Sequence, residues 1–289
     1  MQAKFGPAGN SQSFSAKYKS STDAPFFLRD MGLDCYEYQC GRGVKVSDAT
    51  AETLLKNAKE CGISLSLHAP YFISLSSVEE EKRENSINYI LQSCDASKRI
   101  GSDRIVIHSG SCAKISREEA LKLAKETLKK ARERAVSLGF EDIHFCPETM
   151  GKVNQLGNLD EVLELCKLDD TFIPCIDFGH LNARDFGSIK GTKQYEYILD
   201  RIENELGSDR LKVFHGHFSK IMYTVPGGEK KHLTFADDQG FGPDHEPLLE
   251  LVAKKNLAPT FICESADTQA EDALTMKRSY LSFIDGEEK

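Results

Sequence analysis

The stretch RIVIHSGSCAKISREEALKLAKETLKKARERAVSLGFEDIHFCPE, residues 104–148, contains the structural unit that decides the fold. Its two ends, Arg104–His108 and Ile143–Glu148, are short apolar runs of the kind that form buried strands. Between them lies an amphipathic segment near Ser116–Leu138, which opens with a capping signal, a serine followed by two glutamates. The stretch therefore predicts a strand–helix–strand unit, from which parallel sheets are built.

The same alternation runs along the whole chain of 289 residues. Strands are predicted near Lys4–Gly6, Cys35–Gln39, Ser64–Tyr71, Arg104–His108, Ile143–Glu148, Phe172–Asp177, Leu211–Phe218 and Thr260–Ser265. Helices are predicted near Asp48–Cys61, Val78–Ile100, Ser116–Leu138, Leu159–Cys166, Thr192–Leu206, Glu246–Lys255 and Thr268–Ile284. This count favours an α/β fold, a single-domain (β/α)8 TIM barrel over residues 1–289, with a doubly wound open sheet as the alternative.

The only long irregular connection is Lys220–His245, which we interpret as a functional loop or a small hairpin because compact domains seldom contain such loops. Composition is that of a globular protein, with 40% hydrophobic and 28% charged residues. Residues 1–10 lack the features of a secretory signal, and no apolar run is long enough to cross a bilayer. Nine cysteines without CxxC spacing indicate free thiols, so we expect a cytoplasmic protein. Because no apolar run could span a bilayer, we expect no membrane contact.

The candidate functional residues share one position, the carboxyl end of an apolar run or the loop that follows it. They are His68, His108, Glu148, Asp177, His180, His215, His217, His232 and Glu264. In a TIM barrel these ends converge on one face, where active sites are built. A single histidine at a strand end is more often structural, but six of the eight histidines fall on this predicted face. Imidazoles and carboxylates gathered in this way are typical of zinc or manganese sites.

The number of candidate ligands indicates more than one ion, because a catalytic zinc ion needs about three protein ligands and a water. His215 and His217 alternate with phenylalanine and glycine residues, so both are predicted to face the same side of their strand. Two ions about 3.5–4 Å apart, bridged by a carboxylate, favour displacement at phosphorus. Hydrolysis of a phosphate ester is therefore the predicted chemistry. The net charge of −8 argues only weakly against a nucleic-acid substrate, because bound divalent ions would add positive charge locally.

At these residues the chain resembles the endonuclease IV family of apurinic/apyrimidinic endonucleases, within the wider xylose isomerase-like barrel group. The matching segments are LSLHAPYFISLSS (residues 65–77), VIHSGS (106–111), PETMGK (147–152), CIDFGHLNARDFG (175–187), LKVFHGHFSK (211–220), GEKKHLTF (228–235) and ICES (262–265). They follow the family's order and spacing over nearly the whole chain, and HAPY is the most specific of them. The set of glutamate, aspartate and histidine residues is shared more widely, including by sugar epimerases and isomerases.

The resemblance implies two or three Zn²⁺ ions, with Mn²⁺ as an alternative. It places His68 and His108 on the first ion and makes Glu148 the catalytic bridge to the second. The family cleaves the phosphodiester on the 5′ side of an abasic site in DNA during base excision repair. The implied partner is therefore DNA with abasic sites, and we expect the protein to act as a monomer.

The same resemblance assigns Asp177, His215 and Glu264 to the second ion, and His180 and His232 to the third. For contacts with DNA, Tyr71 stands where the family's DNA-contacting loop begins. Further candidates are basic residues in or near predicted strand–helix loops: Arg42, Lys152, Arg184, Lys220, Lys230 and Lys231.

The chain departs from the family pattern at the third ion, where the family usually has an aspartate two residues before the last histidine. Lys230 occupies that position, and an ammonium group has no lone pair to offer a metal. Glu229 and His217 are the alternative ligands, or the third site is weak or empty. His217 itself stands where the family has an asparagine, which indicates a divergent branch.

Three functions follow from this pattern. The first is a metal-dependent DNA repair nuclease, and the second is a sugar isomerase or epimerase with one divalent ion on Glu148, Asp177, His215 and Glu264. The third is an inactive barrel that serves as a metal-bound binding module, for which Lys230 is the main support. The nuclease needs His68 and His108 as metal ligands, whereas the isomerase uses them only as substrate contacts. The metal content per chain therefore separates the first two functions, with two or three zinc ions for the nuclease and one manganese or magnesium ion for the isomerase.

Overall fold

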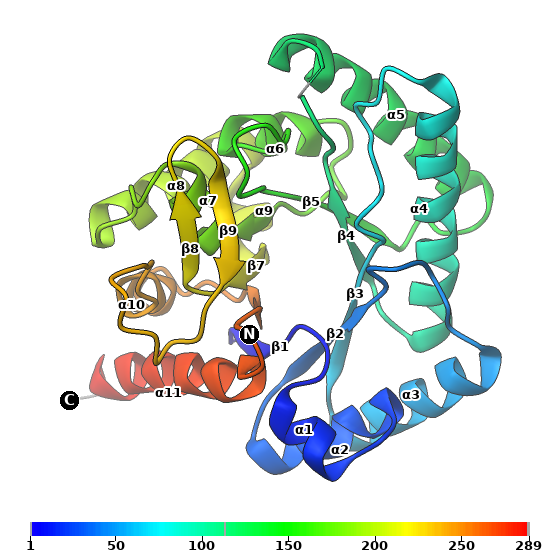
Figure 1. Ribbon diagram of the computed structural model, residues 1–289. Helices are drawn as coiled ribbons and strands as arrows, with labels where there is room; N and C mark the ends of the chain where they lie inside the picture. Colours follow the sequence, from blue (N-terminus) through cyan, green and yellow to red (C-terminus); the bar gives the residue numbers. More distant parts are fainter. Residues whose placement is uncertain (1, 113, 288–289) are drawn as a thin grey trace.

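The fold, seen in a computed structural model that describes residues 2–112 and 114–287, is a barrel of parallel strands with helices outside it (Figure 1). In spatial order the strands of the eight-stranded sheet are β1 (Lys4–Pro7), β10 (Thr260–Cys263), β7 (His215–Phe218), β6 (Cys175–Asp177), β5 (His144–Glu148), β4 (Arg104–His108), β3 (Ser64–His68) and β2 (Cys35–Gln39). The two outermost strands of this order are joined by a parallel bridge between Ala8 and Glu37 and by the hydrogen bond from Gly9 N to Glu37 O, 2.9 Å. This bridge closes the sheet, so the predicted TIM barrel is confirmed.

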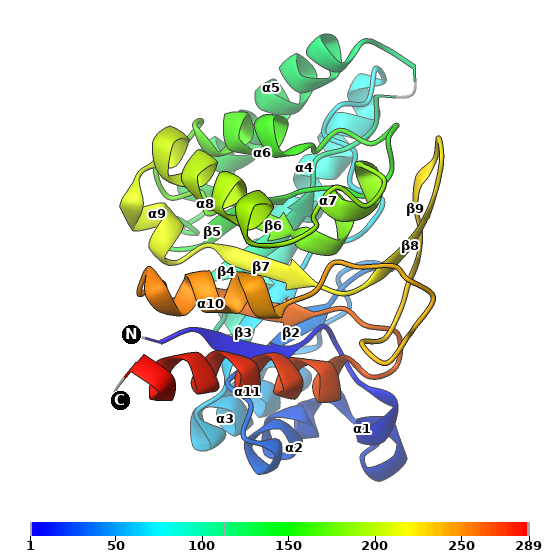
Figure 2. The same cartoon turned by 90° about the vertical axis from the view of Figure 1, so that its left-hand side faces the viewer.

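The helices surround the sheet, as Figures 1 and 2 show. They are α1 (Gln12–Lys17), a 3-10 turn (Ser21–Asp23), α2 (Ala24–Met31), α3 (Asp48–Cys61), α4 (Glu80–Ile100), α5 (Arg117–Ser137), α6 (Leu159–Cys166), α7 (Phe178–Arg184), α8 (Thr192–Leu206), α9 (Ser208–Lys212), α10 (Glu246–Lys254) and α11 (Gln269–Glu287). All seven predicted helices are present, and the caps expected at Ser116 and Asn158 both accept backbone N–H groups. None of the described helices is long and apolar enough to cross a membrane.

The structure differs from the predicted elements in three places. The strand expected from Leu211 begins only at His215, because residues 208–212 form helix α9 after a break at Gly207, whose φ of 91° ends α8. Helix α7 follows β6 without a loop, since the Asp177 carboxylate accepts the His180 backbone N–H at 2.6 Å and so caps the helix. Helices α1 and α2 in the first connection are also absent from the prediction.

Alternation along β4 shows how the strands present their residues. Ile105 and Ile107 belong to the large apolar core between the sheet and the helices. Val106 belongs instead to a small separate cluster with residues of β5 and β6, inside the barrel. His108 and Arg104 share the inward side with Val106, because side chains alternate along a strand. The barrel interior thus carries a metal-ligand type of residue at one end of β4 and an arginine at the other.

The long connection predicted over Lys220–His245 contains a hairpin of β8 (Ile221–Thr224) and β9 (Gly228–His232), which confirms the second of the two interpretations. Figure 2 shows the hairpin beyond the carboxyl end of β7, away from the two chain termini. It stands beside the predicted catalytic face and contributes His232 to it.

Candidate metal centre

The first metal-ligand group joins β3, β4 and β5. The Glu148 Oε2 atom lies 3.3 Å from His68 Nε2 and 3.1 Å from His108 Nε2, and the two imidazole rings are 5.0 Å apart. His68 donates its Nδ1 hydrogen to the Ala69 carbonyl at 2.8 Å, which leaves Nε2 free to face the group. One ligand atom from each of the three residues lies within 4.8 Å of the others, so an ion can be held between them.

The second group consists of Glu148, Asp177, His217 and Glu264, again with all ligand atoms within 4.8 Å of one another. His217 Nδ1 lies 3.1 Å from Glu148 Oε1 and 3.4 Å from Glu264 Oε1. Glu148 therefore turns one oxygen to each group, the arrangement of a bridging carboxylate. The strand register explains why His217 and Asp177 lie side by side, since the two residues are paired across β6 and β7.

The structure differs here from the ligand set that the resemblance implied. His217, expected only as an alternative ligand, takes the place beside Asp177 and Glu264 that had been assigned to His215. His215 lies two residues deeper, paired with Cys175, and its Nε2 atom is 2.9 Å from Glu37 Oε2. It forms a separate buried group with Cys175 and His217.

Glu37 is a residue of the candidate site that the sequence did not reveal. It is fully buried in β2, where its carboxylate lies against His215 and within 3.2 Å of His217 Nε2. The Ser66 hydroxyl donates to Glu37 Oε2 at 2.9 Å, and Gln39 donates to Oε1 at 3.1 Å. The only signal was a glutamate inside a short strand, flanked by two tyrosines. Buried glutamates almost always have partners, which a single strand cannot identify.

The third group consists of His180, His232 and Glu264. The Nδ1 atoms of the two histidines are already engaged, with the Thr149 carbonyl at 2.9 Å and the Ser219 hydroxyl at 2.9 Å. Their Nε2 atoms lie 3.6 Å and 3.8 Å from the carboxylate oxygens of Glu229. Both imidazoles thus present one free nitrogen toward the same carboxylate.

The position of Lys230 follows from the alternation along β9. Glu229 is half-buried and faces the two histidines, whereas Lys230 is exposed. The lysine therefore does not enter the third group, and Glu229 lies where a carboxylate ligand is needed.

Electrostatics inside the barrel favour anionic carboxylates. Burial disfavours the charged form of Glu148, but the charge of His217 and hydrogen bonds from His108 and His180 hold the pKa of this carboxyl well below its ordinary value. Burial also disfavours the charged form of Glu37, but contacts with His217 and His215 hold the pKa of this carboxyl well below its ordinary value. Two carboxylates are thus ionised in the dry interior.

Burial dominates at two other members of the cluster. It raises the pKa of Asp177 to about 6 and lowers the pKa of His215 to about 4. Among the described residues, His215 Nδ1 is buried without a hydrogen-bond partner, whereas Asp177 Oδ2 and His217 Nε2 lie 3.2 Å from His180 Nδ1 and Glu37 Oε1, respectively. Imidazole nitrogens and carboxylate oxygens within 4.8 Å of one another are ligands that Zn²⁺ and Mn²⁺ take in proteins, so the donor set fits either ion.

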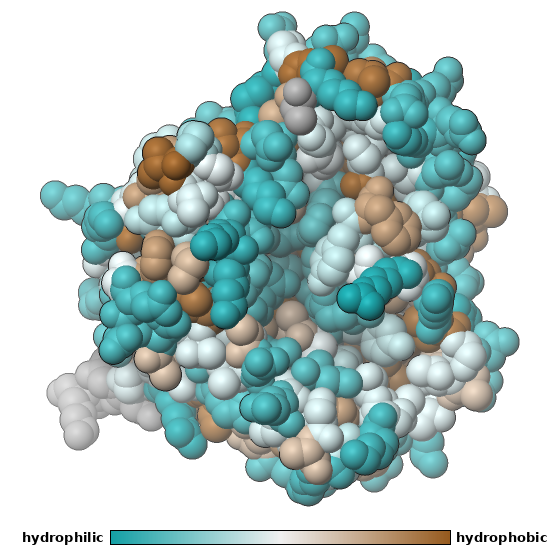
Figure 3. Space-filling view, in the orientation of Figure 1, coloured by the Kyte–Doolittle hydropathy of each residue, from teal (hydrophilic) through white to brown (hydrophobic). Residues whose placement is uncertain are grey.

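The candidate metal centre opens to a cavity of about 300 Å³ lined by Ala8, Gln39, Tyr71, His232, Glu264 and Gln269. Figure 3 shows a hollow near the middle of this face, surrounded mostly by hydrophilic residues. Tyr71 is 54% exposed, stacks on His108 at 5.4 Å and donates its hydroxyl to Gln39 at 3.0 Å. It therefore stands between the histidines of the first group and solvent.

The basic residues expected near DNA lie in different environments. Arg42 is exposed in the loop after β2, next to Gly41, whose carbonyl accepts the Tyr71 N–H at 3.2 Å. Lys220 donates to the carbonyls of Phe235 at 2.9 Å and Asp237 at 3.3 Å. Its ammonium group thus connects the loop before the hairpin to the segment that follows it. Arg184 was a candidate for contact with the DNA backbone, but its side chain is buried, so this prediction is wrong. Its guanidinium instead holds the loop after β5, donating to carbonyls of Met150, Lys152, Val153 and Gln155.

Three comparisons place this geometry among known proteins. The chain is 33% identical over 273 residues, 94% of its length and 95% of the relative's, to an uncharacterized protein of Methanocaldococcus jannaschii. It is 24% identical to a probable endonuclease 4 of Natranaerobius thermophilus, covering 74% of this chain and 78% of that one. Its fold is similar to that of a D-tagatose 3-epimerase-like protein, with a TM-score of 0.68 and 17% identity, covering 99% of this chain and all of the other.

The family whose profile matches is described as xylose isomerase-like TIM barrel, and the match covers residues 26–280. The barrel, its closure and the inward-facing acids and histidines agree with that assignment. The chain belongs to the xylose isomerase-like TIM-barrel family, and its resemblance to endonuclease IV places it in a divergent branch of that family.

Proposed function

We propose that this protein is a zinc-dependent endodeoxyribonuclease that hydrolyses the phosphodiester on the 5′ side of an abasic site in DNA. The observation that carries the proposal is the position of Glu148, whose Oε2 atom lies within 3.3 Å of His68 and His108 while Oε1 faces His217. A single-ion isomerase would use His68 and His108 only as substrate contacts and would not need them as metal ligands. The relationship to a probable endonuclease 4 supports the same choice.

The residues of the chain divide the work in the proposed reaction. When bound, divalent ions would supply positive charge to the phosphate oxygens that become more negative during displacement. Glu148 would hold two ions at adjacent positions, and Glu37 would fix the ring of His217 from behind. Tyr71 would limit water at the first group and present an exposed ring to an unstacked nucleotide.

Incision of a duplex that contains one abasic site tests this proposal. The zinc-loaded protein is expected to cut the strand 5′ to the abasic site and to leave a 3′-hydroxyl end. A matched duplex without the lesion should remain intact, and chelation should abolish incision until zinc is restored. The proposal fails if purified protein shows no incision with zinc, manganese or magnesium.

A second candidate is a sugar isomerase or epimerase, because the group of Glu148, Asp177, His217 and Glu264 by itself resembles a four-ligand site for one divalent ion. Similarity in fold to an epimerase-like protein is compatible with this candidate. Metal analysis separates the two functions, since two or three ions per chain are expected for the nuclease and one for the isomerase.

A further inference from the structure

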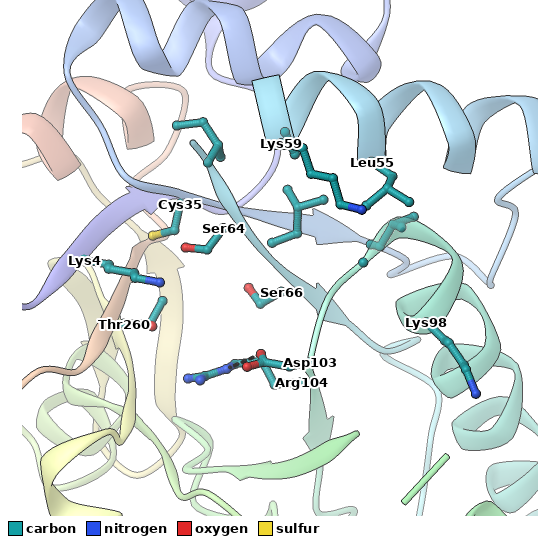
Figure 4. Close-up of a pocket in the computed structure, with 15 residues that line it drawn as sticks. Lys4, Cys35, Leu55, Lys59, Ser64, Ser66, Lys98, Asp103, Arg104 and Thr260 are labelled. Atoms are coloured by element: carbon teal, nitrogen blue, oxygen red, sulfur yellow. Dashed lines mark hydrogen bonds and ion pairs between the residues drawn. The ribbon is translucent and has the colours of Figure 1, made fainter. Parts of the chain in front are cut away.

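A second cavity, of about 380 Å³, lies at the opposite end of the barrel from the metal centre (Figure 4). The first residues of five strands line it: Lys4 of β1, Cys35 of β2, Ser64 of β3, Arg104 of β4 and Thr260 of β10. These are the amino-terminal ends of the strands, whereas the metal ligands stand at or beyond the carboxyl ends. The proposed reaction makes no use of this cavity.

Charge in this cavity is opposite to that of the molecule as a whole. Four cationic side chains line it, Lys4, Lys59, Lys98 and Arg104, against the single carboxyl group of Asp103. The chain as a whole has a net charge of −8. Lys98 donates its Nζ to the Gly139 carbonyl at 2.8 Å, but Lys4 and Lys59 form no ion pair with any residue that the structure describes. Two ammonium groups therefore remain available to an anion.

Arg104 is the deepest of these cations, with its side chain only 14% exposed. Its Nε atom donates to Asp103 Oδ1 at 3.0 Å, the contact marked in Figure 4. Its Nη1 atom is buried and has no acceptor among the described residues. A guanidinium carries five N–H donors in a planar fork that matches the oxygens of phosphate or carboxylate. Leaving such donors unpaired away from water is unfavourable, and an anion in the cavity would supply the missing acceptors.

We propose that this cavity binds a phosphate group, held by Arg104 at its base and by Lys4 and Lys59 at its rim. Its volume of about 380 Å³ falls within the usual range for small-molecule sites, about 300–1,000 Å³. The group belongs either to free phosphate or to a small phosphorylated molecule such as a sugar phosphate. The proposed phosphate ligands are distinct from the nuclease centre, because Lys4, Lys59 and Arg104 belong to none of the metal-ligand groups.

Isothermal titration calorimetry of the full-length, metal-loaded protein tests the site, with inorganic phosphate and ribose 5-phosphate as the two probes. Arg104→Gln removes the planar fork and is expected to weaken binding about tenfold, the scale of one lost charge-assisted hydrogen bond. Arg99→Gln is the matched control, since Arg99 also lies near this end of the barrel but pairs with Asp95 and does not line the cavity. It should bind both probes as the unchanged protein does.

Lys4→Gln with Lys59→Gln is the second variant, because both side chains are exposed and their loss does not threaten folding. This double variant should also weaken binding, with a shallower dependence on salt. Tighter binding of ribose 5-phosphate than of phosphate identifies a phosphorylated molecule as the ligand, and equal binding identifies free phosphate. Phosphate bound at the metal centre would not respond to these changes. Binding that is absent, or that is identical in all variants, overturns the proposal.

Incision of abasic DNA by the Arg104→Gln variant separates this proposal from the proposed function. Normal incision with weakened phosphate binding supports the cavity site. Inactive wild-type protein that still loses phosphate affinity on Arg104→Gln rejects the nuclease and leaves the cavity site standing.

Discussion

At the scale of single residues, Glu148 holds the proposed centre together because each of its oxygens faces a different group of histidines. Glu148→Gln replaces the oxygen nearest one group with an amide nitrogen and removes the negative charge. We expect incision to fall by about 100-fold or more, the scale of losing one electrostatic element of an active site. The side chain keeps its size, so circular dichroism should show an unchanged fold. Near-normal incision by this variant would contradict the bridging role.

Glu37 gives a second prediction at this scale, since its carboxylate contacts both His215 and His217 in the dry interior. Glu37→Gln keeps the shape but removes the charge that orients His217, and partners behind a ligand typically account for about 10–100-fold in metal affinity. Competition with a chromophoric chelator should measure that loss. Ser66→Ala is the control, because it removes only one hydrogen bond to Glu37 Oε2 and leaves the carboxylate in place. Its effect on metal affinity should therefore be smaller. If Glu37→Gln binds metal as tightly as Ser66→Ala does, Glu37 does not position His217.

The choice between His215 and His217 shows what the sequence could not supply. Both histidines were correctly predicted on the same side of one strand, and their rings lie 5.2 Å apart. The alternation of side chains along a strand tells which side of the sheet a residue faces, but not how far it lies from the open end of the barrel. Depth depends on register with the neighbouring strand, which pairs Asp177 with His217 and Cys175 with His215.

At the scale of elements, the hairpin of β8 and β9 brings Glu229 to the third group while Lys230 points away. Glu229→Gln should therefore reduce the zinc content by the equivalent of one weakly held ion, measured by mass spectrometry after dialysis. Lys230→Gln, on the adjacent exposed position, should leave the zinc content unchanged. If Glu229→Gln retains every ion, the third group does not depend on this carboxylate.

The alternation of strands and helices was predictable because most barrel strands lie in short apolar runs and some helices begin at a capping residue, such as Ser116 and Asn158. Where local signals were weak the prediction failed, as for α9, which occupies residues expected to begin a strand. Contacts between distant elements were beyond local patterns. Glu37 of β2 reaches histidines of β7 across the barrel interior, and no spacing within either strand indicates that they meet.

At the scale of the whole molecule, binding of ions at the barrel rim should stabilise the fold. Ions that bind only the folded state at about 100 times their Kd add roughly 2.7 kcal/mol to the free energy of unfolding. For a domain of 289 residues that corresponds to a Tm change of about 4–5 °C, because the unfolding entropy is about 2.1 cal/mol/K per residue. Chelation should lower Tm by that amount, and added zinc should restore it. A Tm that does not respond to chelation would mean that the groups hold no ion in the folded protein.

The most direct measurement is an anomalous difference map of the zinc-loaded crystal, recorded on both sides of the zinc absorption edge. The account predicts one peak among His68, His108 and Glu148 and a second among Asp177, His217 and Glu264, about 3.5–4 Å apart. A third, weaker peak is expected between His180, His232 and Glu229. A single peak at Asp177 and Glu264, with none beside His68 and His108, would contradict the account and favour a one-ion enzyme.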